Sequence, residues 1–186
     1  MARIIVAQFI TLDGVVEDPD GSDRTSFGGW ALRHGREAIA GDKFGYGTIL
    51  RTGVFVFGRA TWDHFSTLWP GRVDPFALAL NAAHKVVATR SPIDLTRWQH
   101  SRTIEGDVLT WARDESRHRD VVLIGSSGLV DQFNAAALVD EYRLRIFPTV
   151  TGAGRKLFPH GRHLDLVSAQ QLGPTILAIY KPSTVA

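Results

Sequence analysis

The chain has 186 residues, a formal net charge of +2 and no cysteine. That length suits one domain able to bury about two-thirds of its unfolded surface, and the lack of cysteine excludes disulfides, thiolate catalysis and cysteine-ligated zinc. Basic residues are scattered among acids and no apolar run approaches the roughly 20 residues of a membrane span, which argues against nucleic-acid and membrane partners. We expect a single cytoplasmic domain over residues 1–186, without a signal peptide.

The first half of the chain predicts strands that alternate with helices and loops. Residues 2–10, ARIIVAQFI, predict a strand, and residues 11–30, rich in Asp, Gly and Ser, predict a long loop of a kind that is usually functional or mobile. Residues 37–51 resemble a helix that contains several glycines. Further strands are expected at 54–57 and 84–89, and further helices at 60–68 and 76–82.

The second half begins with a helix at 107–116 and a buried strand at 121–124, followed by Gly125-Ser126-Ser127-Gly128 and another helix. The tail departs from strict alternation, because its strands are separated by turns and a glycine-rich hairpin is expected at 149–158. These strands are expected at 143–148, 164–172 and 175–181. The sequence therefore predicts a three-layer α/β fold with a mixed, mostly parallel central sheet and a C-terminal antiparallel hairpin.

Three predicted strand ends carry residues suited to binding a phosphate. At the first, Gly58-Arg59-Ala60-Thr61, a strand meets a helix whose backbone N–H groups favour anions. Arg59 would supply a bidentate fork and Thr61 a hydroxyl donor. The alternative is a surface arginine, with Thr61 only helping to start the helix.

The second strand end, Thr89-Arg90-Ser91, offers a guanidinium between two hydroxyls. That set suits a ribose or a 2′-phosphate, and its alternative is a polar loop. The third, Gly125 to Gly128, lets the backbone approach an anion at a helix N-terminus, although it lacks the full GxGxxG spacing and such turns are common in α/β folds. The coincidence of three such ends favours a nucleotide bound at the carboxyl edge of an open sheet.

In this order, these residues resemble the dihydrofolate reductase superfamily, and more closely the branch with the reductase domain of riboflavin biosynthesis. The resemblance spans nearly the whole chain. It rests on Thr11-Leu12-Asp13-Gly14, Gly58-Arg59-Ala60-Thr61-Trp62, the strand ending at Thr89, IGSSGLVDQF and, most specifically, LVDEYRLRIFPTVTGAGRKLF. It implies a dihydrofolate-reductase-like fold, NADPH as the hydride donor, a pterin or pyrimidine as the acceptor, and a homodimer.

The resemblance also implies which residues contact the cofactor. Arg59 and Thr61 look like the adenosine-phosphate contacts, beside Gly58, and Thr89 and Arg90 look like further adenosine-side contacts. The residues that resemble the pyrophosphate turn are Gly125, Ser126, Ser127, Gly128 and Leu129. The chain departs from the resemblance at Ser126-Ser127, because similar turns often have a second glycine there. Without it the backbone would approach the pyrophosphate less closely, and a serine hydroxyl would have to make that contact instead.

Two aspartates are candidates for the acid that supplies a proton. Asp42 lies sixteen residues before Gly58, the separation of the active-site carboxylate in dihydrofolate reductases that resemble this chain. Semi-buried against Phe44 or Tyr46, it would have a raised pKa. The alternative is a solvated Asp early in a helix. Asp13 stands where the superfamily's mobile lid begins, and would order the lid, contact substrate or serve as the acid, unless it only forms an Asp-Gly turn.

Two hypotheses of different classes follow. The first is an NADPH-dependent reductase of a small conjugated heterocycle, as in the reduction of a ribosylaminopyrimidine or of dihydrofolate. The second is a non-catalytic nucleotide-binding or regulatory protein that retains the pocket, as Ser126-Ser127 and the uncertain acid suggest. The two differ in whether bound NADPH is consumed. No metal is expected, because no carboxylate near His160 and His163 completes a metal triad.

Overall fold

The computed structural model describes residues 2–183 and divides into two compact units. The first unit consists of Met1–Val6 and Gly45–Val139, and the second of Ala7–Phe44 and Asp140–Ala186. The predicted single domain over 1–186 includes residue 1 and residues 184–186, which lie outside the described residues. One domain over the whole chain stays a prediction.

The first unit is built on short parallel strands of apolar residues. β2 (Val54–Gly58) pairs in parallel with β3 (His84–Ala88) and with β5 (Val121–Ile124), and β3 pairs in parallel with β4 (Ser101–Thr103). Every residue of β5 and all but the last of β2 are buried. Continuous apolar runs form such strands because both faces of a parallel sheet are covered.

Helices follow these strands at local signals that the sequence contains. Asp74 and Asp107 cap helices by accepting hydrogen bonds from the N–H groups of Ala77 and Thr110. The helices of this unit are α2 (Ile49–Thr52), α3 (Arg59–Leu68), α4 (Pro75–Ala82), the 3₁₀ turn η2 (Leu95–Arg97), α5 (Val108–Glu115) and α6 (Ser127–Ala135). In the part of the chain that the structure describes, no helix is long and apolar enough to cross a membrane.

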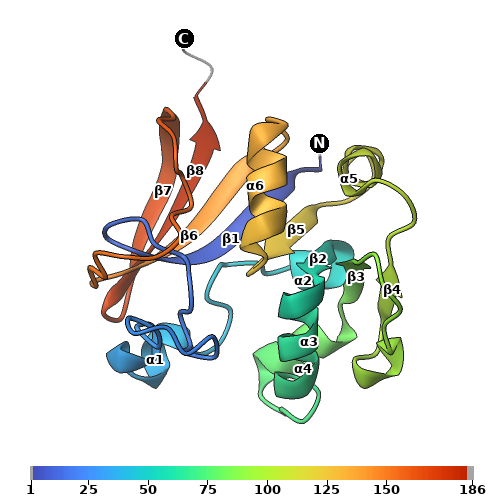
Figure 1. Cartoon of the computed structure of the whole chain (residues 1–186), viewed down its shortest axis with the longest axis horizontal. Coiled ribbons are helices and arrows are strands. Elements are labelled where there is room, and N and C mark those ends of the chain that lie inside the picture. Colours follow the sequence, from blue (N-terminus) through green and yellow to red (C-terminus); the bar gives the residue numbers. More distant parts are fainter. Residues whose placement is uncertain (1, 184–186) are drawn as a thin grey trace. The chain divides into compact units, whose positions relative to one another are not determined.

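The second unit contains the larger part of β1 (Ile4–Thr11), the 3₁₀ turn η1 (Leu32–His34), α1 (Arg36–Ile39) and three antiparallel strands. These strands are β6 (Glu141–Phe147), β7 (Leu164–Leu172) and β8 (Thr175–Pro182), and β8 pairs with both others. They run side by side in orange to red in Figure 1. Phe9, Trp30 and Phe147 form a core cluster, in which the ring centroids of Phe9 and Phe147 are 4.9 Å apart.

The complete sheet has eight strands in the order β4-β3-β2-β5-β1-β6-β8-β7, with helices around it. It confirms the predicted α/β fold with a mixed, mostly parallel sheet, and the C-terminal antiparallel hairpin is the β7–β8 pair. Apart from residues 37–51 and 149–158, the predicted strands and helices are present, with ends shifted by at most two residues. The periodicity of apolar residues therefore predicts most of the secondary structure.

Two local predictions are wrong. The helix predicted at 37–51 is interrupted between α1 and α2, where Gly41, Gly45 and Gly47 adopt positive φ angles of 68°, 62° and 53°, a conformation that ends helices. The segment 149–158 forms no hairpin but an irregular loop with one isolated antiparallel bridge, from Lys156 to Val15. In addition, β4 has only three residues, too few for a pattern to show in the sequence.

A buried lysine closes the C-terminal end of α4. Lys85 is 1% exposed, and its Nζ donates hydrogen bonds to the carbonyl oxygens of Leu80, Asn81 and Ala83 at 3.2, 2.8 and 2.7 Å. It also lies 4.8 Å from the centroid of the Trp98 ring. Burial lowers the pKa of Lys85 to about 7, whereas the helix carbonyls and the ring favour its charged form. Lys85 thus pairs with carbonyls that have no partner within the helix.

Replacing Lys85 by methionine is expected to lower the free energy of unfolding by about 2 kcal/mol, because buried carbonyls lose their donor. Urea unfolding at pH 6, below the lowered pKa of about 7, measures the effect with the amine charged. Lys181→Met is the control, since Lys181 is exposed. Equal stability of the two variants would show that Lys85 does not stabilise α4.

Candidate cofactor site

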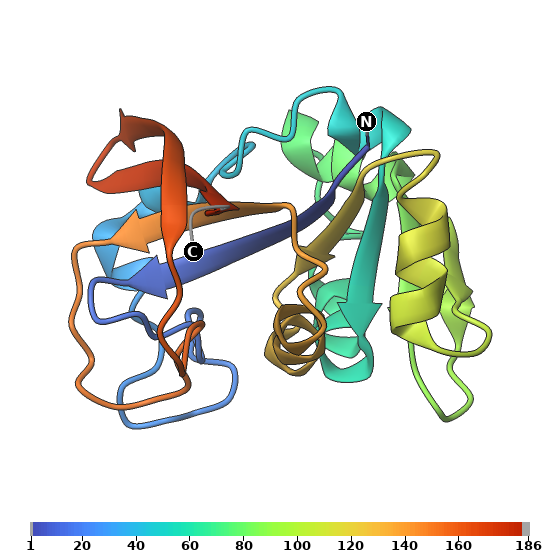
Figure 2. The ribbon, with the colours of Figure 1, turned by 90° about the horizontal axis from the view of Figure 1, so that it is seen from above.

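The carboxyl ends of β3, β2 and β5 meet at one edge of the first unit. Gly58 at the end of β2 lies opposite Ala88, the residue before Thr89, and Val56 lies opposite Leu123 of β5. α3 begins directly after β2, and α6 begins after the turn that follows β5. Figure 1 shows α6 above α3, and Figure 2 shows the same ribbon from above. The structure thus brings the three predicted strand ends together.

The hydroxyl of Ser126 joins two of these ends. Its Oγ accepts a hydrogen bond from the Gly58 N–H at 2.7 Å and donates one to Thr61 Oγ1 at 3.0 Å. Ser126 is only 6% exposed, so its hydroxyl is used inside the protein and does not replace close backbone approach to a ligand. Ser126 Oγ also lies 3.3 Å from the Ile124 carbonyl oxygen, so its one proton has two acceptors, and the contact with Thr61 holds that hydroxyl beside the turn.

Gly125 and Gly128 differ in whether the backbone and its neighbours require a glycine. Gly125 has a φ of +67°, and a Cβ there would lie 3.0 Å from Thr61 Cγ2, so conformation and space both require glycine. At Gly128, in the first turn of α6, a Cβ would meet nothing within 4 Å. Ser127 is partly exposed and Leu129 is buried beneath the turn. The open space and the N–H groups of a first helical turn fit a pyrophosphate.

Cationic and hydroxyl groups flank these turns. Arg59 is the first residue of α3, and it donates from Nε to Asp63 Oδ2 at 2.6 Å and from Nη1 to the Pro92 carbonyl at 2.8 Å. Its guanidinium therefore points toward the loop after β3, where Arg90 is exposed. The Thr89 hydroxyl instead donates to the carbonyl two residues later at 3.0 Å, which matches the alternative of a polar loop.

Two further residues join this charged group, and the sequence analysis missed both. Asp63 accepts from Arg59 on one carboxylate oxygen and from Arg97 Nη1 on the other, at 3.0 Å. Arg97 also donates from Nη2 to the Asp63 carbonyl at 3.1 Å and lies 5.4 Å from the centroid of the Trp62 ring. The i,i+4 spacing of Arg59 and Asp63 is a signal in the sequence, but nothing local to Arg97 shows that it reaches α3.

Asp13 ties the end of β1 to the loop after β6. Its carboxylate accepts hydrogen bonds from the Thr11 hydroxyl at 2.6 Å and from the N–H groups of Thr151 and Gly152 at 3.3 and 2.9 Å. The Thr11 hydrogen bond is the main cause that lowers the pKa of Asp13 to about 2. Of the roles predicted for Asp13, ordering a loop fits this geometry, whereas so low a pKa leaves no proton to donate at neutral pH.

Asp42 lies in the loop between α1 and α2 and is exposed. The prediction of a semi-buried carboxyl on a helix is therefore wrong, because glycines at positive φ interrupt the helix there. Two residues later, the Phe44 carbonyl accepts a hydrogen bond from Arg143 Nη1 at 3.2 Å, and Arg143 Nε donates to Glu141 at 2.7 Å. The loop backbone is thus anchored beside Asp42, whose role as the acid stays a prediction.

The candidate residues divide between the two units. Every predicted cofactor contact belongs to the first unit, and both aspartates belong to the second. Among residues 2–183, no group of three or more His, Asp or Glu side chains is placed to hold a metal ion. The first unit therefore offers N–H, hydroxyl and guanidinium donors, the set that suits phosphate oxygens.

If the three strand ends bind a nicotinamide nucleotide, replacing Ser126 by alanine is expected to weaken the binding of NADPH and NADH alike, about tenfold, because the Gly58 N–H loses its buried acceptor. Quenching of tryptophan fluorescence measures both dissociation constants. Ser66→Ala is the matched control, since Ser66 is also 6% exposed and its hydroxyl bonds only within α3, to the Asp63 carbonyl. Unchanged constants in Ser126→Ala would contradict this role.

The chain is similar to known proteins in sequence and in fold. YyaP of Bacillus subtilis strain 168, an uncharacterized protein, is 26% identical over 164 residues, which are 84% of this chain and 80% of YyaP. A putative riboflavin biosynthesis protein from Shewanella sp. PV-4 has a TM-score of 0.73 and 17% identity, over 97% of this chain and 99% of that one. A pyrimidine reductase-like protein from Corynebacterium diphtheriae has a TM-score of 0.64 and 12% identity, over 98% and 92% of the two chains.

The chain is also similar to one part of a longer protein. Acinetobacter baumannii RibD has a TM-score of 0.63 and 18% identity, over 98% of this chain but 58% of RibD. At these identities the solved structures show likeness of fold alone. The sequence profile of the RibD C-terminal domain, however, matches residues 2–178, which confirms the resemblance predicted from the motifs. Because the match covers nearly the whole chain, this protein belongs to the RibD C-terminal domain family.

Proposed function

We propose that this protein is an NADPH-dependent reductase of a small conjugated heterocycle, pterin-like or ribosylaminopyrimidine-like. Family membership supports a reductase-like function of the riboflavin-pathway type. The observation that carries the cofactor assignment is the meeting of three strand ends with N–H, hydroxyl and guanidinium donors in one unit. Such donors at the carboxyl ends of parallel strands bind dinucleotide phosphates. The cysteine-free composition supports a cytoplasmic location.

Within this proposal, each strand end has a distinct part. The N-terminus of α6 holds the pyrophosphate, where the positive φ of Gly125 and the open space at Gly128 permit close approach. The Thr61 hydroxyl adds a donor, and Arg59 and Arg90 bind the adenosine phosphate. When bound, NADPH supplies the hydride, and the protein supplies orientation and shielding from water.

The two aspartates take different parts in the proposal. Asp13, with its pKa lowered to about 2, is ionised at neutral pH and holds the loop after β6 by accepting hydrogen bonds. Asp42 stays the candidate proton donor, on the loop that the hydrogen bond from Arg143 to the Phe44 carbonyl anchors. The acid is thus assigned to Asp42 and the ordering role to Asp13.

One observation favours a second function of a different class. The burial expected of a catalytic carboxyl is absent at Asp42, which is exposed. A nucleotide-binding or regulatory protein needs the phosphate donors of the first unit but no acid. The two functions differ in whether bound NADPH is oxidised when a heterocyclic acceptor is added.

Arg59→Ala is expected to weaken NADPH binding at least about tenfold and NADH binding less than about threefold, because only NADPH carries the 2′-phosphate. Quenching of the protein's five tryptophans measures both constants. Absorbance at the nicotinamide band, after addition of dihydrofolate or a ribosylaminopyrimidine, measures turnover. Arg117→Ala is the matched control, an exposed arginine of the same unit that pairs with Asp114.

Each outcome of this experiment separates the alternatives. NADPH-selective binding followed by oxidation supports the reductase, and tight binding without oxidation supports the non-catalytic function. Binding of neither nucleotide contradicts both functions. Equal losses for NADPH and NADH in Arg59→Ala would remove Arg59 from the 2′-phosphate contact.

We also propose a homodimer that is joined through β7. β7 is the outermost strand of the sheet, and none of its residues is buried. Leu166 and Val167 are 59% and 53% exposed. Long edge strands with few charges pair with other strands unless something covers them. β7 of a second copy can pair with this strand, because a twofold axis brings the same surface of both copies together.

Leu166→Lys is expected to shift the protein from a dimer toward a monomer of 20.5 kDa, because the variant buries an unpaired charge in the interface. Light scattering after size-exclusion chromatography measures the mass. Leu78→Lys is the matched control, since Leu78 is 55% exposed on α4. A wild-type monomer at all concentrations, or a dimer unchanged by Leu166→Lys, would refute this interface.

A further inference from the structure

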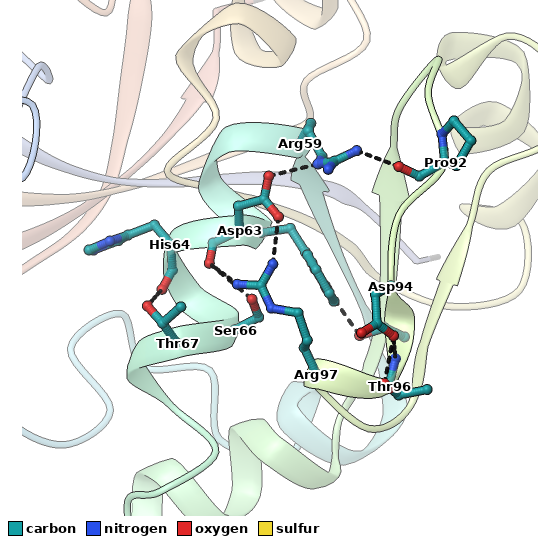
Figure 3. A network of polar contacts seen from close by, with 11 residues as sticks. Arg59, Asp63, His64, Ser66, Thr67, Pro92, Asp94, Thr96 and Arg97 are labelled. Atoms are coloured by element: carbon teal, nitrogen blue, oxygen red, sulfur yellow. Dashed lines mark hydrogen bonds and ion pairs between the residues drawn. The ribbon is translucent and has the colours of Figure 1, made fainter.

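Two arginines from separate segments share one carboxylate in the first unit. Figure 3 shows Arg59 above Asp63 and Arg97 below it. Arg59 Nε lies 2.6 Å from Oδ2, and Arg97 Nη1 lies 3.0 Å from Oδ1. The two guanidinium groups are therefore held one carboxylate apart. Their side chains are 40% and 38% exposed, so a ligand can reach both.

The loop that carries Arg97 is ordered so as to present it. Asp94 accepts hydrogen bonds from the N–H and the hydroxyl of Thr96 at 3.1 and 2.6 Å and so caps η2. Arg97 then lies against the Trp62 ring, and Trp62 Nε1 donates to Ser101 Oγ at 3.1 Å. Contacts on both sides thus hold Arg97 beside Trp62 and Asp63 of α3.

Donor groups remain available on both arginines. Arg59 uses Nε and Nη1, and Arg97 uses Nη1 and Nη2. Within residues 2–183, Arg59 Nη2 and Arg97 Nε donate to no protein acceptor. Guanidinium N–H groups of this kind bind phosphate oxygens well. The pair therefore has spare donors for an anionic ligand.

Arg97 decides the net charge of the group formed by Arg59, Asp63 and Arg97. The charge of Arg59 and that of Asp63 cancel, so that Arg59 with its partner offers no net attraction to an anion. Arg97 brings the sum of the three groups to +1. A phosphate monoester carries about −1.5 to −2 charges at neutral pH, so its binding needs this surplus. Arg90 and Asp94 are both exposed on the segment before Arg97 and carry opposite charges, so they leave this sum unchanged.

We propose that Arg97 is a second residue for the 2′-phosphate of the nucleotide, and that Asp63 is the positioning residue that spaces Arg97 from Arg59. This inference rests on the proposed NADPH-binding function and deepens it. The phosphate monoester is bound by two guanidinium groups held on one carboxylate, rather than by Arg59 alone. Preference for NADPH over NADH is then a property of the pair.

The test compares Arg97→Gln, Arg97→Lys and the control Arg72→Gln in the full-length protein. Arg72 is a matched choice because it also lies over a tryptophan, 4.9 Å from the centroid of Trp69 in the same unit. Fluorescence titration with NADPH and NADH gives the selectivity of each variant, and thermal unfolding checks its fold. Arg97→Gln is expected to lose about tenfold in NADPH affinity with NADH changed less than about twofold, because only the phosphate contact is lost.

Arg97→Lys, which keeps the charge, is expected to retain most of the selectivity, and Arg72→Gln all of it. If wild type prefers NADPH and Arg97→Gln keeps that preference, the inference is overturned while the proposed function stands. Equal losses for both nucleotides would show that Arg97 acts only through the fold, and also overturn it. If wild type binds neither nucleotide, the proposed function itself fails.

Discussion

The parallel pairing of β2 with β3 and β5 decides where every candidate cofactor contact lies. Because Gly58 pairs with Ala88 and Val56 with Leu123, the residues that follow each strand emerge at the same edge. Two helices, α3 and α6, begin there, and the N–H groups of a first helical turn have no partner within the helix. Shifting one strand would separate donors that are far apart in the sequence. The site therefore depends on buried apolar strands whose own side chains lie in the core.

Polar side chains stabilise this arrangement by satisfying backbone groups that the strands and helices leave unpaired. Ser126 accepts from the Gly58 N–H, and Lys85 donates to the last carbonyls of α4. Both side chains are buried, where an unpaired backbone group costs about 1–3 kcal/mol. Their hydrogen bonds thus join elements that hydrophobic contact alone would leave free to slide.

Aspartates have the corresponding role in the second unit. The long loop that follows β1 is ordered around Asp18, which is 3% exposed and accepts from the N–H groups of Asp23 and Thr25 and from the Thr25 hydroxyl. Burial alone would raise the pKa of Asp18, but these hydrogen bonds lower it overall. Trp30 Nε1 donates to the Glu17 carbonyl at 2.8 Å. A loop whose length suggests mobility is therefore tied down by its own side chains.

The sequence by itself determined the fold class, most strands and helices, and the residues at the three strand ends. Those features follow from local patterns, such as the apolar run of β5 and the cap of α5 by Asp107. Only the tertiary structure decided that Ser126 turns inward, that Asp42 is exposed and that Arg97 reaches Asp63. Thirty-four residues separate that last pair. The physical reason is that periodicity records which face of an element is buried, whereas side-chain pairing depends on which distant segments the sheet order brings together.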